Sequence, residues 1–313
     1  MRAEGRPDRN DVMSLDLSSA RIAFLGLGKM GLPMASRLVA AGWTVIGFDP
    51  SRAASEAFAA AGGRAAHSAR AAAERASIVV TMLPDGKAVR AVLAGPDGVA
   101  GCLAPGAIVI DMSSSAPVGT RDLARELGGA GIVLIDAPVS GGVKRAVDGT
   151  LAIMVGGDEA AAAAVRPLLE RLGTSLFETG PVGSGHAMKA LNNYVSAAGL
   201  TAACEALRIG TSFGLDPELM TDILNVSTGR NNSTDVKLKP YVIPKSYTSG
   251  FSMALMAKDL RTADELARHE GIPAPLSHAV ASLWQDALAD LGAEADHTAI
   301  DAFLAALPAP ARE

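Results

Sequence analysis

Short apolar runs rich in β-branched residues alternate with alanine-rich stretches through the first half of the chain. The stretches 33–41, 53–61 and 118–127 have helical composition, and each is followed by glycine. Strands that alternate with helices form βαβ units, and such strands pair in parallel. This half therefore predicts a doubly wound parallel sheet, with strands in the runs IAFLGLG, TVIGFDP, ASIVVTMLP, AIVIDMS, GIVLIDAP, TLAIMVGG and TSLFETG.

The pattern changes after Gly183. From about Ser184 to Phe213 there is no proline and little clustering of β-branched residues, which predicts one helix about 45 Å long. Beyond Gly214, alanine, leucine, methionine and acidic residues recur at helical spacing, with interruptions at prolines. An all-helical second half is therefore expected.

A glycine-rich turn follows the first predicted strand. The apolar residues Ile22 to Leu25 lead into Gly26-Leu27-Gly28-Lys29-Met30-Gly31 and then into a helical segment. In this motif the first glycine allows a tight turn, the second lets a pyrophosphate approach the backbone, and the third lets helix and strand pack closely. Free N–H groups at the helix start then face the anion. The motif predicts dinucleotide binding; a glycine turn that serves only packing is the alternative.

An acidic residue stands where such a motif needs one. Asp49 lies 18 positions after Gly31, at the end of the next predicted strand. Its carboxylate would accept hydrogen bonds from the adenosine ribose and repel a 2′-phosphate, which favours NAD over NADP. Two alternatives stay open: Asp49 could be a turn residue ahead of Pro50, and Arg52 could pair with a 2′-phosphate.

Together these patterns predict an α/β protein with three segments. A loose N-terminal extension occupies residues 1–19, and a Rossmann-type doubly wound domain occupies residues 20–181. A long interdomain helix and an all-α C-terminal domain occupy residues 182–313.

Composition excludes several classes of protein. Of the 313 residues, 49% are hydrophobic and 19% are charged, which is enough apolar material for a core and excludes disorder throughout. A net charge of −5 lacks the basic footprint of a nucleic-acid-binding protein. No apolar window is long enough for a membrane span. Only two cysteines occur, without CxxC or HExxH, so we expect no disulfide framework, no metal site and a cytoplasmic location.

Lys189 and Asn193 are candidate catalytic residues near the start of the long helix. They are four positions apart and share one helix face. The positive end of the helix dipole favours the neutral amine, which can exchange a proton with a hydroxyl or carbonyl. A solvated surface lysine is the alternative. His186 could line the same pocket or simply pack.

Ser140, Gly141 and Gly142 follow the apolar run GIVLIDAPV. A hydroxyl followed by two glycines at the carboxyl end of a strand can form a nest of N–H groups that binds an anion. An ordinary strand-to-loop turn is the alternative reading.

These segments together resemble the β-hydroxyacid dehydrogenase family, which includes 3-hydroxyisobutyrate dehydrogenase and tartronate semialdehyde reductase and has the NAD-binding type of 6-phosphogluconate dehydrogenase. They occur in the family's order and span nearly all of the chain after residue 20. The matching pieces are FLGLGKMGLPMA (24–35), MLPDG (82–86), DMSSSAP (111–117), DAPVSGG (136–142), GSGHAMKALNN (183–193) and MAKDL (256–260).

The resemblance implies hydride transfer between NAD(P) and a short β-hydroxy acid, in a homodimer or homotetramer. It implies that Lys189 is the general acid/base and that Asn193 orients the substrate. Ser140, Gly141 and Gly142 would hold the substrate carboxylate, with Phe251 nearby. The implied cofactor-binding residues are Gly26, Leu27, Gly28, Met30, Gly31, Asp49, Leu83, Pro84, Ser114 and Lys258.

One stretch departs from the family's best-known members, and two other functions stay open. Residues 225–242 differ from the best-known 3-hydroxyisobutyrate enzymes, and Asn231 and Asn232 within them are expected to face the substrate pocket. An imine reductase shares the architecture but is expected to carry another residue at the position of Lys189. A non-catalytic NAD-binding scaffold is the second alternative.

Overall fold

The computed structural model describes residues 20–308. The extension expected at 1–19 lies outside the described residues. The chain divides into two compact units, the first ending at Lys189 and the second beginning at Ala190.

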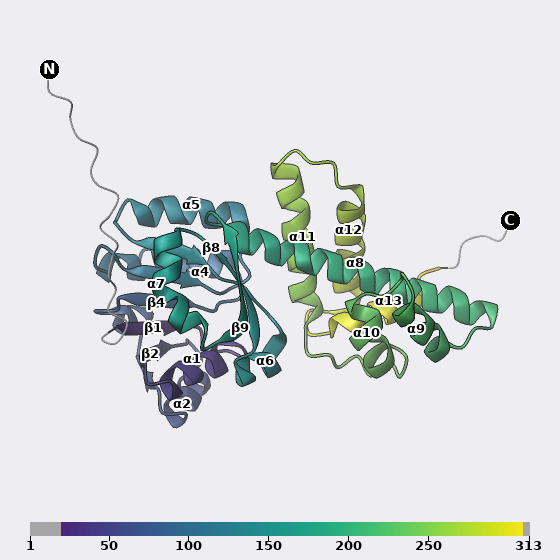
Figure 1. Cartoon of the computed structure of the whole chain (residues 1–313), viewed down its shortest axis with the longest axis horizontal. Coiled ribbons are helices and arrows are strands. Elements are labelled where there is room, and N and C mark those ends of the chain that lie inside the picture. Colours follow the sequence, from purple (N-terminus) through teal and green to yellow (C-terminus); the bar gives the residue numbers. More distant parts are fainter. Residues whose placement is uncertain (1–19, 309–313) are drawn as a thin grey trace, which may run out of the picture. The chain divides into compact units, whose positions relative to one another are not determined.

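The first unit is a nine-stranded sheet with helices on both faces (Figure 1). Its strands are β1 (Arg21–Leu25), β2 (Thr44–Phe48), β3 (Arg64–Ala65), β4 (Ile78–Thr81), β5 (Ile108–Asp111), β6 (Val133–Asp136), β7 (Val139–Ser140), β8 (Leu151–Gly156) and β9 (Gly173–Gly180). Its helices are α1 (Gly31–Ala40), α2 (Arg52–Ala60), α3 (Ala69–Ala73), α4 (Gly86–Ala94), α5 (Pro117–Gly128), α6 (Gly142–Asp148) and α7 (Glu159–Leu169), with a 3₁₀ turn at Val99–Cys102.

Alternate residues of the central strands face two different cores. Ile22, Phe24 and Val80 pack with residues of α1, α2 and α7. Ala23 and Val79 pack on the other face with residues of α3, α4 and α5. This is the two-residue period of a strand buried on both sides, and it explains why the strands read as continuous apolar runs.

The sheet is dominated by parallel strands but is not parallel throughout. Strands β3-β2-β1-β4-β5-β6 are parallel, and the order reverses direction between β1 and β4, where ligands of such sheets bind. β8 runs antiparallel to β6. The predicted parallel sheet is confirmed for these six strands, and β8 departs from it at this edge.

The connection between β6 and β8 contains the short strand β7 and the seven-residue helix α6. β7 itself pairs antiparallel with β8, so the chain reverses direction within this connection. β9 then pairs in parallel with β8 after the longer helix α7.

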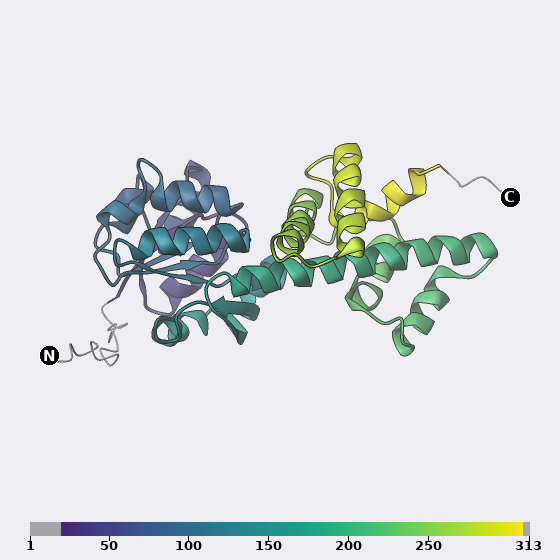
Figure 2. The same ribbon diagram turned by 90° about the horizontal axis from the view of Figure 1, so that it is seen from above.

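The long helix α8 (Ser184–Phe213) has the bounds that the sequence predicts (Figure 2). It begins in the first unit and continues into the second, whose core contains Leu200, Met253, Met256 and Trp284. The other helices of this unit are α9 (Pro217–Val226), α10 (Asn232–Val236), α11 (Met253–His269), α12 (Pro275–Leu291) and α13 (Ile300–Ala306), with a π turn at Leu238–Val242 and a 3₁₀ turn at His297–Ala299. Among the helices of residues 20–308, none is long and apolar enough to cross a bilayer.

Candidate active site

In the glycine-rich turn between β1 and α1, two glycines are packed too closely to carry a side chain, and the third has open space beside it. Gly26 has φ +99°, and a Cβ there would lie 2.3 Å from the carbonyl oxygen of Met82. A Cβ on Gly31 would lie 1.9 Å from the carbonyl oxygen of Gly26. Gly28 is exposed and a Cβ there would meet nothing within 4 Å. The turn therefore has the close packing and the open backbone that a pyrophosphate requires.

Asp49 is held against this turn by both of its oxygens. Oδ2 accepts a hydrogen bond from the amide of Leu27 at 2.8 Å, and Oδ1 accepts one from the amide of Ser51 at 2.7 Å. The turn role and the ribose role are thus compatible, because each carboxylate oxygen retains a further lone pair. Arg52 is 92% exposed and pairs with Glu56 at 2.7 Å.

A cavity of about 680 Å³ adjoins the turn on the first unit. Its walls are mostly apolar, as the adenosine half of a dinucleotide requires. The glycine turn, the carboxylate beside it and this cavity together fit a bound NAD(P). The lining residues are Leu25, Gly26, Phe48, Pro50, Ser68, Ala69, Arg70, Leu83, Ala88, Ala91, Val92 and Asp97.

Two exposed glycines with positive φ follow the short strand β7. Gly141 has φ +133° and Gly142 has φ +70°, and both are exposed. Ser140 is half-buried in β7 directly before them. A Cβ on Gly141 would lie 2.4 Å from Cδ of the exposed Arg145 side chain, and the positive φ disfavours any residue other than glycine there. The turn can present consecutive N–H groups to a carboxylate.

Two buried carboxylates end neighbouring parallel strands. Asp111 ends β5 and accepts hydrogen bonds from the hydroxyls of Thr81 and Ser115, each at 2.8 Å. Asp136 ends β6, and burial raises its pKa although His186 and backbone N–H groups oppose the shift. Both lie at the carboxyl edge of the sheet, where ligands of this fold bind.

Asp136 fixes the first turn of α8. Its oxygens accept hydrogen bonds from the amide of Gly183 at 2.6 Å and from the amide of His186 at 2.8 Å. A Cβ on Gly185 would lie 2.3 Å from the carbonyl oxygen of Met154, so the helix start packs directly against β8. This turn sets the direction in which α8 leaves the sheet.

The imidazole of His186 adds further hydrogen bonds that hold the start of α8. It is fully buried; Nδ1 lies 2.9 Å from Oγ1 of Thr120, and Nε2 donates to the carbonyl oxygen of Ser113 at 3.1 Å. The hydroxyl of Ser113 in turn accepts a hydrogen bond from the amide of Leu83 at 2.9 Å. One polar network therefore connects the start of α8 with Leu83 and with Ser113, next to residues that the resemblance assigns to cofactor binding.

The sequence left the role of His186 undecided. The available signal was that Asp111 and Asp136 each end a predicted strand, because the carboxyl ends of neighbouring parallel strands meet at one edge. Lys189 follows His186 by three positions, so it lies about one turn further along the fixed helix, and it is half-buried.

The second unit contains the other expected site residues. Asn193 is buried, and its Nδ2 donates to Oδ2 of Asp259 at 2.5 Å. The ammonium of Lys258 lies 3.4 Å from Oδ1 of the same carboxylate. Phe251 is half-buried, and its ring meets that of His297 edge-on at 5.6 Å. Asp259, which lies next to Lys258, is a residue that sequence reasoning missed.

Asn231 has a structural task that the sequence did not reveal. Its Oδ1 accepts hydrogen bonds from the amides of Ser233 at 2.8 Å and Thr234 at 3.2 Å, so it caps α10. It also packs on α8, because a Cβ on Gly199 would lie 3.3 Å from its Cγ. Asn232 is exposed.

Two family models match successive parts of the chain. Residues 21–180 match the NAD binding domain of 6-phosphogluconate dehydrogenase. Residues 183–304 match the NAD-binding domain of NADP-dependent 3-hydroxyisobutyrate dehydrogenase.

Individual relatives agree with these models. The chain is 36% identical to 2-(hydroxymethyl)glutarate dehydrogenase of Eubacterium barkeri, over 85% of this chain and 89% of that enzyme. It is also 36% identical to the NAD-dependent L-serine dehydrogenase of Pseudomonas aeruginosa, over 90% of this chain and 96% of that enzyme. The solved structure of Mycobacterium tuberculosis 3-hydroxyisobutyrate dehydrogenase with L-serine is 37% identical, with a TM-score of 0.84 over 91% of this chain and 99% of that one. The glycine turn and the long helix α8 are consistent with these matches. The chain therefore belongs to the β-hydroxyacid dehydrogenase family of NAD(P)-dependent oxidoreductases.

Proposed function

We propose that the protein oxidises the primary alcohol of a 2-substituted 3-hydroxypropanoate to the semialdehyde, or catalyses the reverse reduction, with Lys189 as the general acid/base. The three alcohols in the names of the relatives support this class, because all are HOCH₂–CH(R)–COO⁻. R is methyl in 3-hydroxyisobutyrate, ammonium in L-serine and 2-carboxyethyl in 2-(hydroxymethyl)glutarate. The observation that carries the proposal is the fixed start of α8, which positions Lys189 and Asn193 on one helix face.

Each residue has a separate task in the oxidation. The nest at Ser140, Gly141 and Gly142 binds the substrate carboxylate through N–H groups, and Asn193 donates a hydrogen bond to the substrate. The neutral amine of Lys189 accepts the hydroxyl proton as the aldehyde C=O bond forms. Nicotinamide, when bound, would accept the hydride, which is the hydrogen of the substrate C–H bond together with both electrons of that bond. In the reduction, protonated Lys189 returns the proton to the carbonyl oxygen.

Asn193 can act in this way because Asp259 orients it. The bond from Nδ2 to Oδ2 of Asp259 fixes the amide plane, and Oδ1 accepts a hydrogen bond from Nδ2 of Asn192 at 3.2 Å. The second N–H of the amide can then donate to the substrate. Lys258 beside the same carboxylate adds positive charge close to the amide.

A panel of alcohols tests the proposal. Formation of NADH or NADPH is followed by absorbance with 3-hydroxyisobutyrate, L-serine and 2-(hydroxymethyl)glutarate. We expect turnover of at least one of the three. Binding of NAD by calorimetry without turnover of any panel member would favour the scaffold function, and reduction of a cyclic imine in place of these alcohols would favour an imine reductase.

The same assay tests the proposed preference for NAD. We expect a higher kcat/KM with NAD than with NADP, because the carboxylate of Asp49 is fixed beside the turn. Asp49→Asn removes the charge, and we expect the ratio of the two kcat/KM values to fall about tenfold, as for a lost hydrogen bond to a charged group. As a control, Arg52→Gln should leave the ratio unchanged, because Arg52 pairs with Glu56. A wild-type preference for NADP would contradict the assignment of Asp49.

Assembly and location belong to the same proposal. We expect a homodimer or homotetramer in the cytoplasm. Large apolar residues that are exposed along α8 and α9 support an oligomer, among them Ile209, Phe213 and Val226.

A further inference from the structure

We propose that Lys237 binds a second anionic group of the substrate, so that the preferred alcohol is a 3-hydroxypropanoate whose 2-substituent ends in a carboxylate. The inference rests on the proposed function and specifies the substrate within it.

Lys237 meets α8 on the face that carries the proposed chemistry. Lys189, Asn193 and Ser196 are at positions i, i+4 and i+7, so Ser196 lies within about 20° of Lys189 around the helix and about 10 Å further along it. The ammonium of Lys237 donates a hydrogen bond to Oγ of Ser196 at 3.2 Å. The ammonium of Lys237 therefore lies at Ser196, at the opposite end from Lys189 of the helix face formed by Lys189, Asn193 and Ser196.

No carboxylate lies close enough to form an ion pair with Lys237 within the part of the chain that the structure describes. By contrast, Lys258 pairs with Asp259 and Lys239 pairs with Asp222. The carboxylate of Asp296 attracts the ammonium from a longer distance, while its oxygens accept hydrogen bonds from Ser249, Gly250 and Thr298.

Lys237 is half-buried, and partial loss of water makes its charge costly. Desolvation lowers the pKa of Lys237 to about 8, because it outweighs the attraction of Asp296. Lysine is rarely buried unless it is paired. A bound carboxylate would supply the missing counter-charge.

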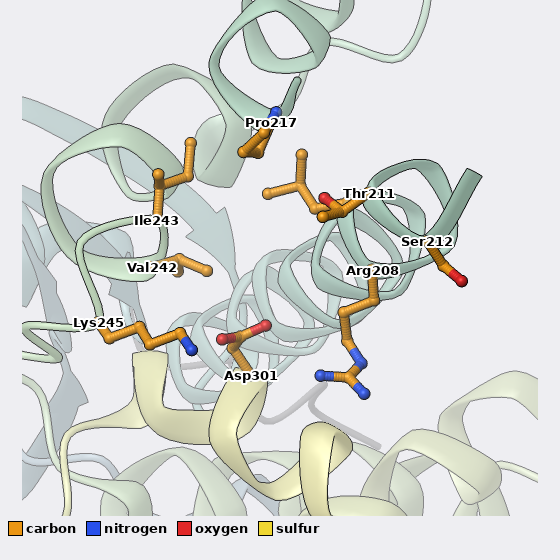
Figure 3. A pocket seen from close by; sticks show the side chains of 9 residues that line it. Arg208, Thr211, Ser212, Pro217, Val242, Ile243, Lys245 and Asp301 are labelled. Atoms are coloured by element: carbon orange, nitrogen blue, oxygen red, sulfur yellow. The ribbon is translucent and has the colours of Figure 1, made fainter. Parts of the chain in front are cut away.

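A cavity in the second unit contains cationic side chains in a different environment from that of Lys237. It has a volume of about 440 Å³ and contains two cationic side chains, Arg208 and Lys245. Both extend toward Asp301, which lies between them (Figure 3). Asp301 also accepts a hydrogen bond from Tyr247 at 2.9 Å. In this cavity a carboxylate of the chain itself lies between the two cationic side chains.

The three panel alcohols differ in the substituent that would meet Lys237. The carboxylate of 2-(hydroxymethyl)glutarate would pair with the ammonium, the methyl group of 3-hydroxyisobutyrate would leave it unpaired, and the ammonium of L-serine would be repelled. We therefore expect wild-type kcat/KM to decrease in that order. A higher kcat/KM for 3-hydroxyisobutyrate or L-serine than for the dicarboxylate would overturn the inference.

Variants test the residue directly. Lys237→Met should reduce kcat/KM for the dicarboxylate at least tenfold more than for 3-hydroxyisobutyrate, mainly through KM, and Lys237→Arg should restore part of the preference. Lys239→Met is the matched control, because Lys239 is a near neighbour that pairs with Asp222. Equal losses on both substrates would mean that Lys237 is only structural, and would overturn the inference.

Inhibition of the wild type gives a readout that needs no variant. Glutarate should compete with the alcohol at least tenfold more tightly than isobutyrate, because only glutarate has a second carboxylate. Equal inhibition constants would overturn the inference even if Lys237→Met does not fold. Absence of dehydrogenase activity on all three alcohols would instead contradict the proposed function, so the two failures are distinguishable.

Discussion

Replacing Lys189 with alanine should lower kcat by about 10²–10⁴-fold and leave the dissociation constant of NAD nearly unchanged. This is the range contributed by one general acid/base group. Cofactor affinity is retained because the glycine turn, Asp49 and the adjoining cavity lie on other elements. Pre-steady-state absorbance and calorimetry measure the two quantities separately.

Arginine at the same position distinguishes proton transfer from charge. Lys189→Arg keeps a cation on the helix but cannot release a proton near neutral pH, so it should be about as slow as the alanine variant. The control is Met188→Ala on the preceding, exposed position, which should retain normal kcat. Near-normal turnover of either Lys189 variant would contradict its role.

Replacing Asp136 with asparagine should reduce both the stability of the first unit and kcat. The carboxylate accepts two buried backbone N–H groups at the start of α8, and an amide has one oxygen to offer them. One donor is then left facing an NH₂ group, which costs about 1–3 kcal/mol of unfolding free energy. Since the bonds of Asp136 also position the first turn of α8 and thereby Lys189, we expect kcat to fall about tenfold or more while the KM for the alcohol changes less.

A matched control separates positioning from simple loss of stability. Leu168→Ala removes a fully buried side chain of α7 in the same unit, at a cost of about 2–5 kcal/mol. At a temperature where both variants are folded by circular dichroism, Leu168→Ala should keep normal kcat and Asp136→Asn should not. Equal kcat values for the two variants would show that Asp136 acts on stability alone.

The sequence predicted what local patterns determine. The glycine turn requires no side chain at Gly26 and Gly31, and the structure shows backbone atoms where their Cβ atoms would be. Helix α8 has the predicted bounds because Ser184 to Phe213 contains no proline and is followed by Gly214 with φ +101°. Both features depend on residues that are consecutive in the sequence.

Features that depend on distant segments were not predictable. The antiparallel return to β8 depends on how separate strands pair, and the roles of Asp136 and His186 depend on partners about 50 or more positions away. Lys237 belongs to no motif, and its meeting with Ser196 over 41 positions is visible only in three dimensions. The assignments of Lys189 and of the cofactor residues to their tasks stay predictions.

Chemical rescue of Lys189→Ala tests the central claim most directly. NADH formation by this variant is measured with increasing concentrations of small primary amines, against tetramethylammonium at equal ionic strength. If the amine at position 189 transfers the hydroxyl proton, primary amines should raise kcat and the effect should follow the pKa of the added amine, while tetramethylammonium should have no effect. A variant that turns over at the wild-type rate without added amine, or one that responds equally to tetramethylammonium, would contradict the claim.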